Sequence, residues 1–314
     1  MMSQPPFEQI ADLLRAGSVV PFLGAGVNPR PPGAHWDGEA TPFLPSGSEL
    51  SRLLARKSNF PSQDEYDLCD LAKVASYFVE TSARRDLREK LHGVFAREFT
   101  PGDIHDYLAS IERPLLIVTT NYDDLMERAL ERAGRAFDLV IHPTDRKDVE
   151  ASVLWWKHGA EEPTAIPPNK LFIDLNAATV VYKMHGTVDR RANRWDSYVI
   201  TEDDYVDFLA RMTNQTAVPA LFMRHFRTRH FLFMGYGLRD WNLRVVLRNL
   251  RNLLPRADAN AMGENDQEQE EELRSWAIQY KPSDLEVELW NARRVKIYDS
   301  DIGLFVQKLK SGGK

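Results

Sequence analysis

Cysteine is almost absent from the sequence, since Cys69 is the single one in 314 residues. One thiol excludes an intrachain disulfide and a zinc site built from several cysteines. No apolar run approaches the roughly 18 residues that a membrane-spanning helix requires. The first residues include acidic side chains and no long apolar core, unlike a secretory signal peptide. We therefore expect a soluble protein of the reducing cytoplasm.

An excess of positive charge is also missing, because 40 Lys and Arg face 46 Asp and Glu and leave a net charge of −6. This balance argues against a large basic surface, so direct nucleic-acid binding is not expected. The hydrophobic content of 43% is ordinary for a globular protein. A chain of this length buries a sizeable core without disulfides or metals.

Short apolar runs typical of buried strands alternate with stretches whose apolar residues have helical spacing. The predicted strands are residues 19–23, 115–118, 137–141, 180–184, 230–234 and 295–298. The predicted helices are residues 7–14, about 123–133, 201–209, 243–250 and 305–309. This alternation predicts an α/β fold with a Rossmann-like, doubly wound and mostly parallel sheet. Residues 142–178 follow no clear pattern, and the acidic stretch 257–272 predicts a solvated loop.

The long stretch between the first two predicted strands has no strand pattern of its own. Residues 29–47 are rich in proline and glycine and predict an irregular loop, whereas residues 48–110 keep helical spacing. We interpret this part as a helical insert that forms a wall or lid of a cleft. We predict a single domain over residues 1–314. Its Rossmann-like core comprises about residues 1–30 and 112–314, and the insert about residues 31–111.

Glycine-rich or polar motifs follow four of the predicted strands. They are FLGAGVN from Phe22, TTNYDD from Thr119, KMHG from Lys183 and MGYGLRDWN from Met234. In a doubly wound sheet, ligands bind at the carboxyl ends of the strands. The four motifs therefore predict one common cleft.

The first motif places Gly24 and Gly26 directly after a strand. Glycines at this point let the backbone approach a pyrophosphate, and a purely structural glycine turn is the open alternative. Pro29 follows Asn28, so the third glycine of the dehydrogenase fingerprint is missing and a regular helix cannot continue. This departure argues against a dehydrogenase that transfers hydride.

The second and third motifs contain side chains suited to chemistry. Asn121 is expected to position a ribose or an attacking water, and Asp123 to hold the loop or a ribose hydroxyl. The alternative is that Asn121 or Asp123 caps the helix that follows. His185 directly ends an apolar strand, and histidine exchanges protons near neutral pH. A core histidine without a chemical role is its alternative.

The set FLGAGVN, TTNYDDLMERA, YKMHG and FMGYGLRDWN, in this order, resembles the sirtuin-like NAD-consuming domains of bacteria from about residue 18 to 250. The resemblance implies that NAD+ is a substrate, cleaved to nicotinamide and ADP-ribose. It implies that Asn121 lies beside the nicotinamide ribose and that His185 is the catalytic histidine. The residues expected to bind NAD+ are Gly24, Ala25, Gly26, Asn28, Thr120, Asp123, Gly235, Tyr236, Gly237 and Asp240.

Some features depart from the sirtuins that deacylate proteins. Their four-cysteine zinc module cannot be built here, so no metal is expected. Asn28 replaces the serine of their GAGxS turn, and Asn121 lies in TTNYD rather than TQNxD. We therefore expect an NAD+ hydrolase. An NAD-dependent deacylase and a non-catalytic NAD or ADP-ribose sensor within a larger assembly are the alternatives.

The resemblance also implies a biological setting. It implies antiviral defence through NAD+ depletion, a homo-oligomer, and a partner such as a hexameric translocase-type ATPase or another defence subunit. Trp276, Tyr280 and Trp290 are interpreted as exposed aromatic residues of an interface.

Overall fold

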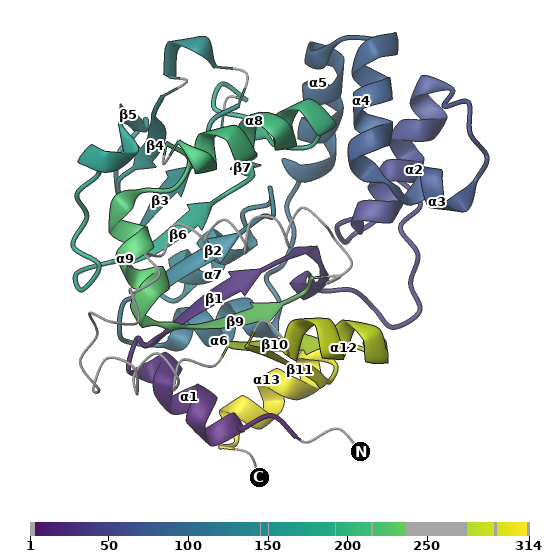
Figure 1. The fold of residues 1–314 in the computed structure, drawn as a ribbon. Coiled ribbons are helices and arrows are strands. Elements are labelled where there is room, and N and C mark those ends of the chain that lie inside the picture. The colour runs from purple at the N-terminus through teal and green to yellow at the C-terminus, as the bar shows by residue number, and fades with distance from the viewer. Residues whose placement is uncertain are drawn as a thin grey trace, which may run out of the picture.

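The computed structural model describes residues 4–144, 146–149, 151–191, 193–214, 216–236, 275–291 and 294–312 (Figure 1). The predicted helix at 243–250 and the predicted loop at 257–272 lie outside these residues. Among the described helices, none is long and apolar enough to cross a membrane.

Within the described residues, a nine-stranded sheet runs through the molecule in the order β11-β10-β9-β1-β2-β6-β3-β4-β5. The strands from β11 to β3 are parallel, and β4 and β5 are added antiparallel at one edge. The strands are β1 Val19–Leu23, β2 Leu116–Thr119, β3 Phe137–Ile141, β4 Val153–Trp156, β5 Thr164–Ile166, β6 Thr179–Lys183, β9 His230–Met234, β10 Ser275–Gln279 and β11 Val295–Asp299. The short strands β7 Gly186–Thr187 and β8 Ser197–Tyr198 pair separately.

Helices cover both faces of the sheet (Figure 1), which confirms the predicted Rossmann-like, doubly wound α/β fold. One face packs against α8, α9 and α12, and the other against α1, α6, α7 and α13. These helices are α1 Phe7–Arg15, α6 Asp103–Ser110, α7 Leu125–Arg132, α8 Glu202–Thr213, α9 Ala220–Thr228, α12 Asp284–Asn291 and α13 Ile302–Lys310. Because both faces are buried, the central strands are apolar throughout rather than alternating.

The stretch between β1 and β2 is helical, as predicted, and contains no strand over residues 48–110. Its helices α2 Gly47–Ser58, α3 Glu65–Cys69, α4 Leu71–Thr81 and α5 Arg84–Phe95 gather at one end of the sheet (Figure 1). They enclose an apolar cluster of their own that includes Leu54, Phe78 and Leu87. The helix α6 lies apart from this helical lobe and packs against α7 and α13.

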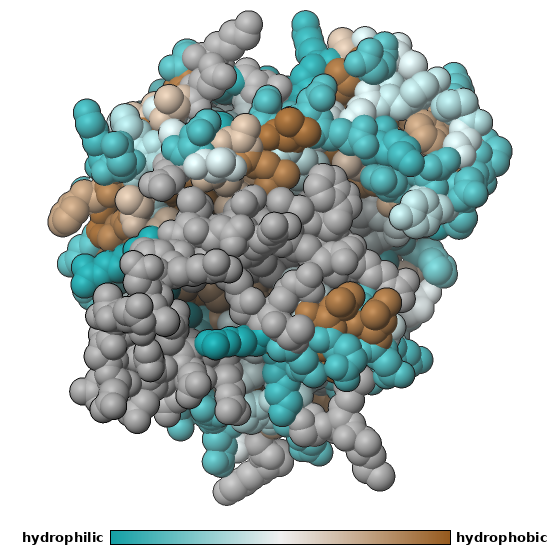
Figure 2. Space-filling view, viewed as in Figure 1, coloured by the Kyte–Doolittle hydropathy of each residue, from teal (hydrophilic) through white to brown (hydrophobic). Residues whose placement is uncertain are grey.

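The C-terminal part of the sheet extends further than the sequence patterns predict. Strand β10 lies between β9 and β11 and was not predicted, and it carries Trp276 into the core against His230. Trp276 and Trp290 are 3% and 2% exposed, so interpreting them as surface aromatics was wrong. Tyr280 is exposed, as are Leu285 and Leu289 on α12, where Figure 2 shows an apolar patch.

The remaining short elements connect these parts. They are the 3-10 turns η1 Ala25–Val27, η2 Lys147–Val149 and η3 Pro168–Lys170. Thr201 caps α8 as predicted, because its side chain accepts a hydrogen bond from the Asp204 N–H within a capping box.

Candidate active site

The carboxyl ends of four parallel strands lie level with one another. In the ladder, Met234 of β9 pairs with Leu23 of β1, Leu23 with Thr119 of β2, and Thr119 with Lys183 of β6. The four motifs therefore begin at the same edge of the sheet. This is the edge at which doubly wound proteins bind their ligands.

The glycine turns after β1 and β9 fit into each other. The Gly24 N–H donates to the Met234 carbonyl and the Gly26 N–H to the Gly235 carbonyl, both at 2.9 Å. A Cβ at Gly24 would lie 2.7 Å from the Gly235 oxygen, so a side chain has no room there. Gly235 itself has a φ of +75°, which favours glycine. These glycines therefore have a structural role in the contact between the two turns, and Ala25 and Gly26 are exposed at the strand edge.

Tyr236 connects the β9 turn to the β2 end. Its Oη donates to the Leu23 carbonyl at 2.8 Å and lies 3.1 Å from Thr120 Oγ1. Its ring packs against Phe22, with the centroids 5.5 Å apart. Thr120 and Tyr236, both expected at the site, are thus adjacent and half-buried.

A short series of side-chain hydrogen bonds connects the first two motifs through Asn121, Asn28 and Asp123. Asn121 Nδ2 donates to Asn28 Oδ1 at 3.4 Å, and Asn28 Nδ2 donates to Asp123 Oδ2 at 2.9 Å. Asp123 Oδ1 also accepts from the Leu125 N–H at 3.2 Å, so Asp123 does satisfy one donor of the first turn of α7. Asn121, by contrast, directs its amide to Asn28 and not to the helix.

A buried ion pair stabilises the loop after β2 that contains Asn121 and Asp123. Lys183 Nζ lies 3.0 Å from Glu127 Oε1 and donates to the Asp123 carbonyl. Both residues are almost fully buried, and burial raises the pKa of the Glu127 carboxyl although the Lys183 ammonium acts in the opposite direction. The pair fixes the position of Asp123 relative to β6. Sequence reasoning missed this pair, because each residue finds its partner on a different element.

Tyr122 joins the same loop to the helical lobe. Its ring is edge-on to Phe95 of α5 at 5.3 Å and to Tyr198 at 5.1 Å. Its Oη donates to the Val199 carbonyl at 2.7 Å. In the loop after β2, the side chain of Asn121 therefore lies at the strand edge, whereas that of the next residue, Tyr122, packs against the helical lobe.

His185 lies beside this loop. The Met184 N–H donates to the Thr119 carbonyl and the Val188 N–H to the Tyr122 carbonyl, both at 2.9 Å. These two bonds hold the segment around His185 alongside the segment around Asn121. The structure thus brings the two expected catalytic residues to adjacent loops.

The environment of His185 keeps its imidazole neutral. The ring is 7% exposed and lies edge-on to Tyr205 and Phe208 of α8, at 5.4 and 5.5 Å. Burial lowers the pKa of His185 to about 3. Its Nε2 has no hydrogen-bond partner among the described residues. The unpartnered Nε2 of this neutral imidazole has a lone pair that can accept a proton, although a pKa this low makes it a weak base.

His142 is a second buried histidine near this position, and no sequence motif pointed to it. It follows β3, whose last residue Ile141 pairs with Lys183, and its ring is edge-on to Phe208 at 4.8 Å. Burial, with a smaller effect of Arg211, holds the pKa of His142 well below its usual value. Phe208 therefore separates two neutral histidines.

Gly237 and Asp240, also expected to bind NAD+, lie outside the described residues. Within the part of the chain that the structure describes, no group of three or more His, Cys, Asp or Glu side chains is placed to hold a metal ion.

Comparison with known proteins agrees with this architecture. The chain matches the SIR2-like domain family over residues 115–297. It is 30% identical over 248 residues to the NAD(+) hydrolase ThsA of Acinetobacter baumannii, covering 78% of this chain and 41% of that protein. It is 27% identical over 253 residues to ThsA of Enterococcus faecium, covering 79% and 43% respectively. Its identity to Defense-associated sirtuin 2 of Bacillus subtilis is 24% over 246 residues, covering 78% and 20%.

A parallel doubly wound sheet with glycine turns and polar loops at one edge defines an α/β protein that binds its ligand at the strand ends. Because the family match covers more than half of its residues, the chain belongs to the SIR2-like domain family. It spans less than half the length of the curated relatives named above.

Proposed function

We propose that this chain hydrolyses NAD+ at the bond between nicotinamide and ribose. The observation that carries the proposal is the buried, unpartnered Nε2 of His185 on a loop adjacent to that of Asn121. The relatives named as NAD(+) hydrolases support the choice of substrate.

The reaction requires little acid catalysis, because nicotinamide leaves as a neutral molecule. The C1′–N bond breaks with its electron pair going to the nicotinamide nitrogen, and positive charge develops on the ribose. Water then forms the new C1′–O bond and loses a proton. We assign Asn121 to holding the ribose and the water, and His185 Nε2 to accepting that proton.

The remaining expected residues fit the other parts of NAD+. The exposed turn of Ala25 and Gly26 offers a backbone surface without bulky side chains to the pyrophosphate. Asn28, Thr120, Asp123 and Tyr236 provide hydroxyl, amide and carboxyl groups for ribose hydroxyls at the same edge. Gly235 holds the β9 turn in place, and Gly237 and Asp240 complete the proposed set.

The decisive experiment measures free nicotinamide from NAD+ with wild type, Asn121→Ala and His185→Ala, together with melting curves. Each substitution is expected to lower the rate by about 10² or more while the fold is kept. Well-folded variants with wild-type rates would contradict the assignment. Release that depends on an added acyl-lysine peptide would instead indicate a deacylase, and NAD+ binding without turnover would indicate a sensor.

We further propose that the activity depletes NAD+ during antiphage defence in the cytoplasm, as the names of the relatives favour. Cells expressing wild type and His185→Ala would be infected with phage and their NAD+ followed over time. Loss of both NAD+ and phage yield only with wild type is the expected result. Equal phage yields with both proteins would contradict it.

A homo-oligomer is also proposed, because α12 exposes Leu285 and Leu289 in one apolar patch. Light scattering of wild type and Leu285→Glu is expected to show a larger particle for wild type. A partner ATPase stays a prediction, tested by purifying the chain with its bound proteins from a native host.

A further inference from the structure

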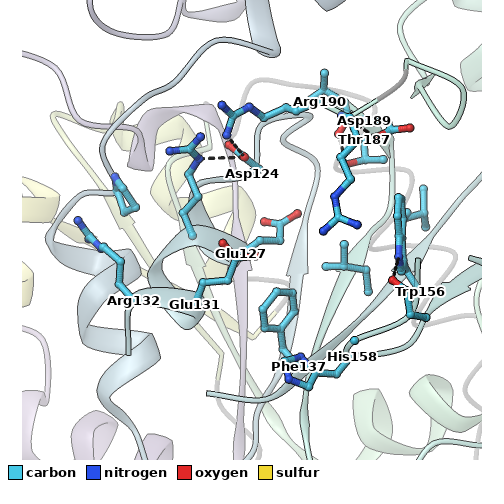
Figure 3. A pocket seen from close by; sticks show the side chains of 18 of the residues that line it. Asp124, Glu127, Glu131, Arg132, Phe137, Trp156, His158, Thr187, Asp189 and Arg190 are labelled. Atoms are coloured by element: carbon cyan, nitrogen blue, oxygen red, sulfur yellow. Dashed lines mark hydrogen bonds and ion pairs between the residues drawn. The ribbon is translucent and has the colours of Figure 1, made fainter. Parts of the chain in front are cut away.

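The segments after β2 and β7 also border a cavity. It has a volume of about 890 Å³ and is bordered by α7, by β3 and β4, and by the loop after β7. Figure 3 shows Asp124, Glu127 and Glu131 on one side of it and Trp156 on the other. None of the described residues expected to bind NAD+ lines this cavity.

The α7 wall contains two carboxylate oxygens that lack donors. Glu127 is 6% exposed, and while its Oε1 pairs with Lys183, its Oε2 has no hydrogen-bond partner among the described residues. Asp124 Oδ2 binds Arg128 and Arg190, but its Oδ1 is buried and has no partner in the described part of the chain. Buried acceptors in proteins are normally satisfied. A ligand that donates hydrogen bonds would complete this wall.

The opposite wall is flat and aromatic. Trp156 is half-buried at the end of β4, and its Nε1 is engaged by the Ala160 carbonyl, which fixes the plane of the indole. The Arg191 guanidinium lies over this ring, 5.8 Å from its centre, so a ligand that stacks there displaces it. A planar ring would find a stacking surface here.

The exposed side chains that line the cavity have both signs of charge, with Glu131 and Glu161 beside two basic residues. Arg191 and Lys157 line it, are exposed, and have no ion-pair partner among the described residues. Arginine and lysine at such a position bind phosphate. Hydrogen-bond acceptors, an aromatic plane and cationic side chains thus border a single cavity.

We propose that this cavity binds a purine nucleotide. The base edge donates to Glu127 and Asp124, the ring stacks on Trp156, and the phosphate lies at Arg191 and Lys157. Guanine fits best, because its N1–H and 2-amino group are two donors on one edge, one for each of the two unpartnered oxygens. The proposal does not depend on NAD+ cleavage.

Calorimetry with guanosine 5′-monophosphate tests the site on the full chain. Arg191→Ala is expected to raise the Kd about tenfold or more, the scale of one charge-assisted hydrogen bond. The matched control is Arg194→Ala, which removes an exposed arginine from the same loop that does not line the cavity. The control is expected to bind with the wild-type Kd. Absence of binding, or equal losses in both variants, would overturn the proposal.

Further arms locate the base. Adenosine 5′-monophosphate is expected to bind more weakly than the guanine nucleotide, and inorganic phosphate more weakly still. Glu127→Gln is expected to weaken binding of the guanine nucleotide more than binding of inorganic phosphate. If Glu127→Gln does not fold, Trp156→Leu is expected to show the same difference. Equal affinities for nucleotide and phosphate would show an anion site only, and nucleotide binding unchanged in Arg191→Ala would place it in the NAD+ site. Either result rejects the proposal.

Discussion

The turns after β1 and β9 are joined by main-chain hydrogen bonds and close glycine contacts, whereas the loops after β2 and β6 combine main-chain hydrogen bonds with buried side-chain contacts. In the first half, Gly24 and Gly26 meet Gly235 with no space for a Cβ. In the second half, Asn28, Asp123 and the Lys183–Glu127 pair hold the loop of Asn121. The glycine half is therefore set by backbone shape, and the catalytic half by charge and hydrogen bonding.

The largest effect on stability is expected at Lys183. Lys183→Met leaves Glu127 buried without its partner, which costs about 3–5 kcal/mol of unfolding free energy. The double variant Lys183→Met with Glu127→Leu removes both charges and is expected to regain most of that loss. Urea unfolding of the three proteins measures both values. A single variant as stable as wild type would show that the pair has no role in holding the loop.

A smaller effect is expected in the glycine half. Gly24→Ala places a Cβ 2.7 Å from the Gly235 oxygen and 2.9 Å from the Tyr236 ring, so the two turns must separate. Overpacking of this kind costs about 1–3 kcal/mol. Gly47→Ala is the control, since a Cβ there meets no atom within 4 Å. Equal melting temperatures for the two variants would mean that the turns do not depend on each other.

The two halves also differ in how far the sequence predicted them. The strands β1, β3 and β9 have the predicted bounds, because parallel strands buried on both faces are continuous apolar runs. The glycine turns were also predicted, because glycines directly after an apolar run are a local sequence signal. The supports of the Asn121 loop were not found, since Tyr122 and Lys183 act through partners that are distant in sequence. Strand β10 was missed because the run that contains Trp276 is short and follows an acidic stretch.

Two buried histidines of the catalytic half make its stability depend on low pH. Burial lowers the pKa of His185 to about 3 and holds that of His142 well below its usual value, so both are neutral in the folded protein. The unfolded chain takes up these protons below about pH 6.5, and stability then falls by up to about 1.4 kcal/mol per pH unit for each histidine. His142→Leu is expected to reduce this slope between pH 6.5 and 4.5, with exposed His35→Leu as the control. Identical slopes in wild type and His142→Leu would contradict the prediction.

The smallest expected effect concerns the link between the catalytic loop and the helical lobe. Tyr122→Phe keeps the ring between Phe95 and Tyr198 but removes the hydrogen bond to the Val199 carbonyl. Loss of one buried hydrogen bond costs about 0.5–1.5 kcal/mol, because the carbonyl loses its donor while the packing remains. If the loop is positioned through this contact, the rate of nicotinamide release falls by more than the folded fraction does.

Two controls separate these contributions. Tyr107→Phe removes a buried hydroxyl that has no hydrogen-bond partner among the described residues, so it is expected to leave both stability and rate near wild type. Tyr122→Leu removes the ring as well and is expected to be the less stable of the two Tyr122 variants, since it also loses the edge-on contacts. Melting curves and nicotinamide release measured on the same preparations compare all three. A Tyr122→Phe protein that is less stable but fully active per folded molecule would show that the lobe supports the fold of the loop without setting the position of Asn121.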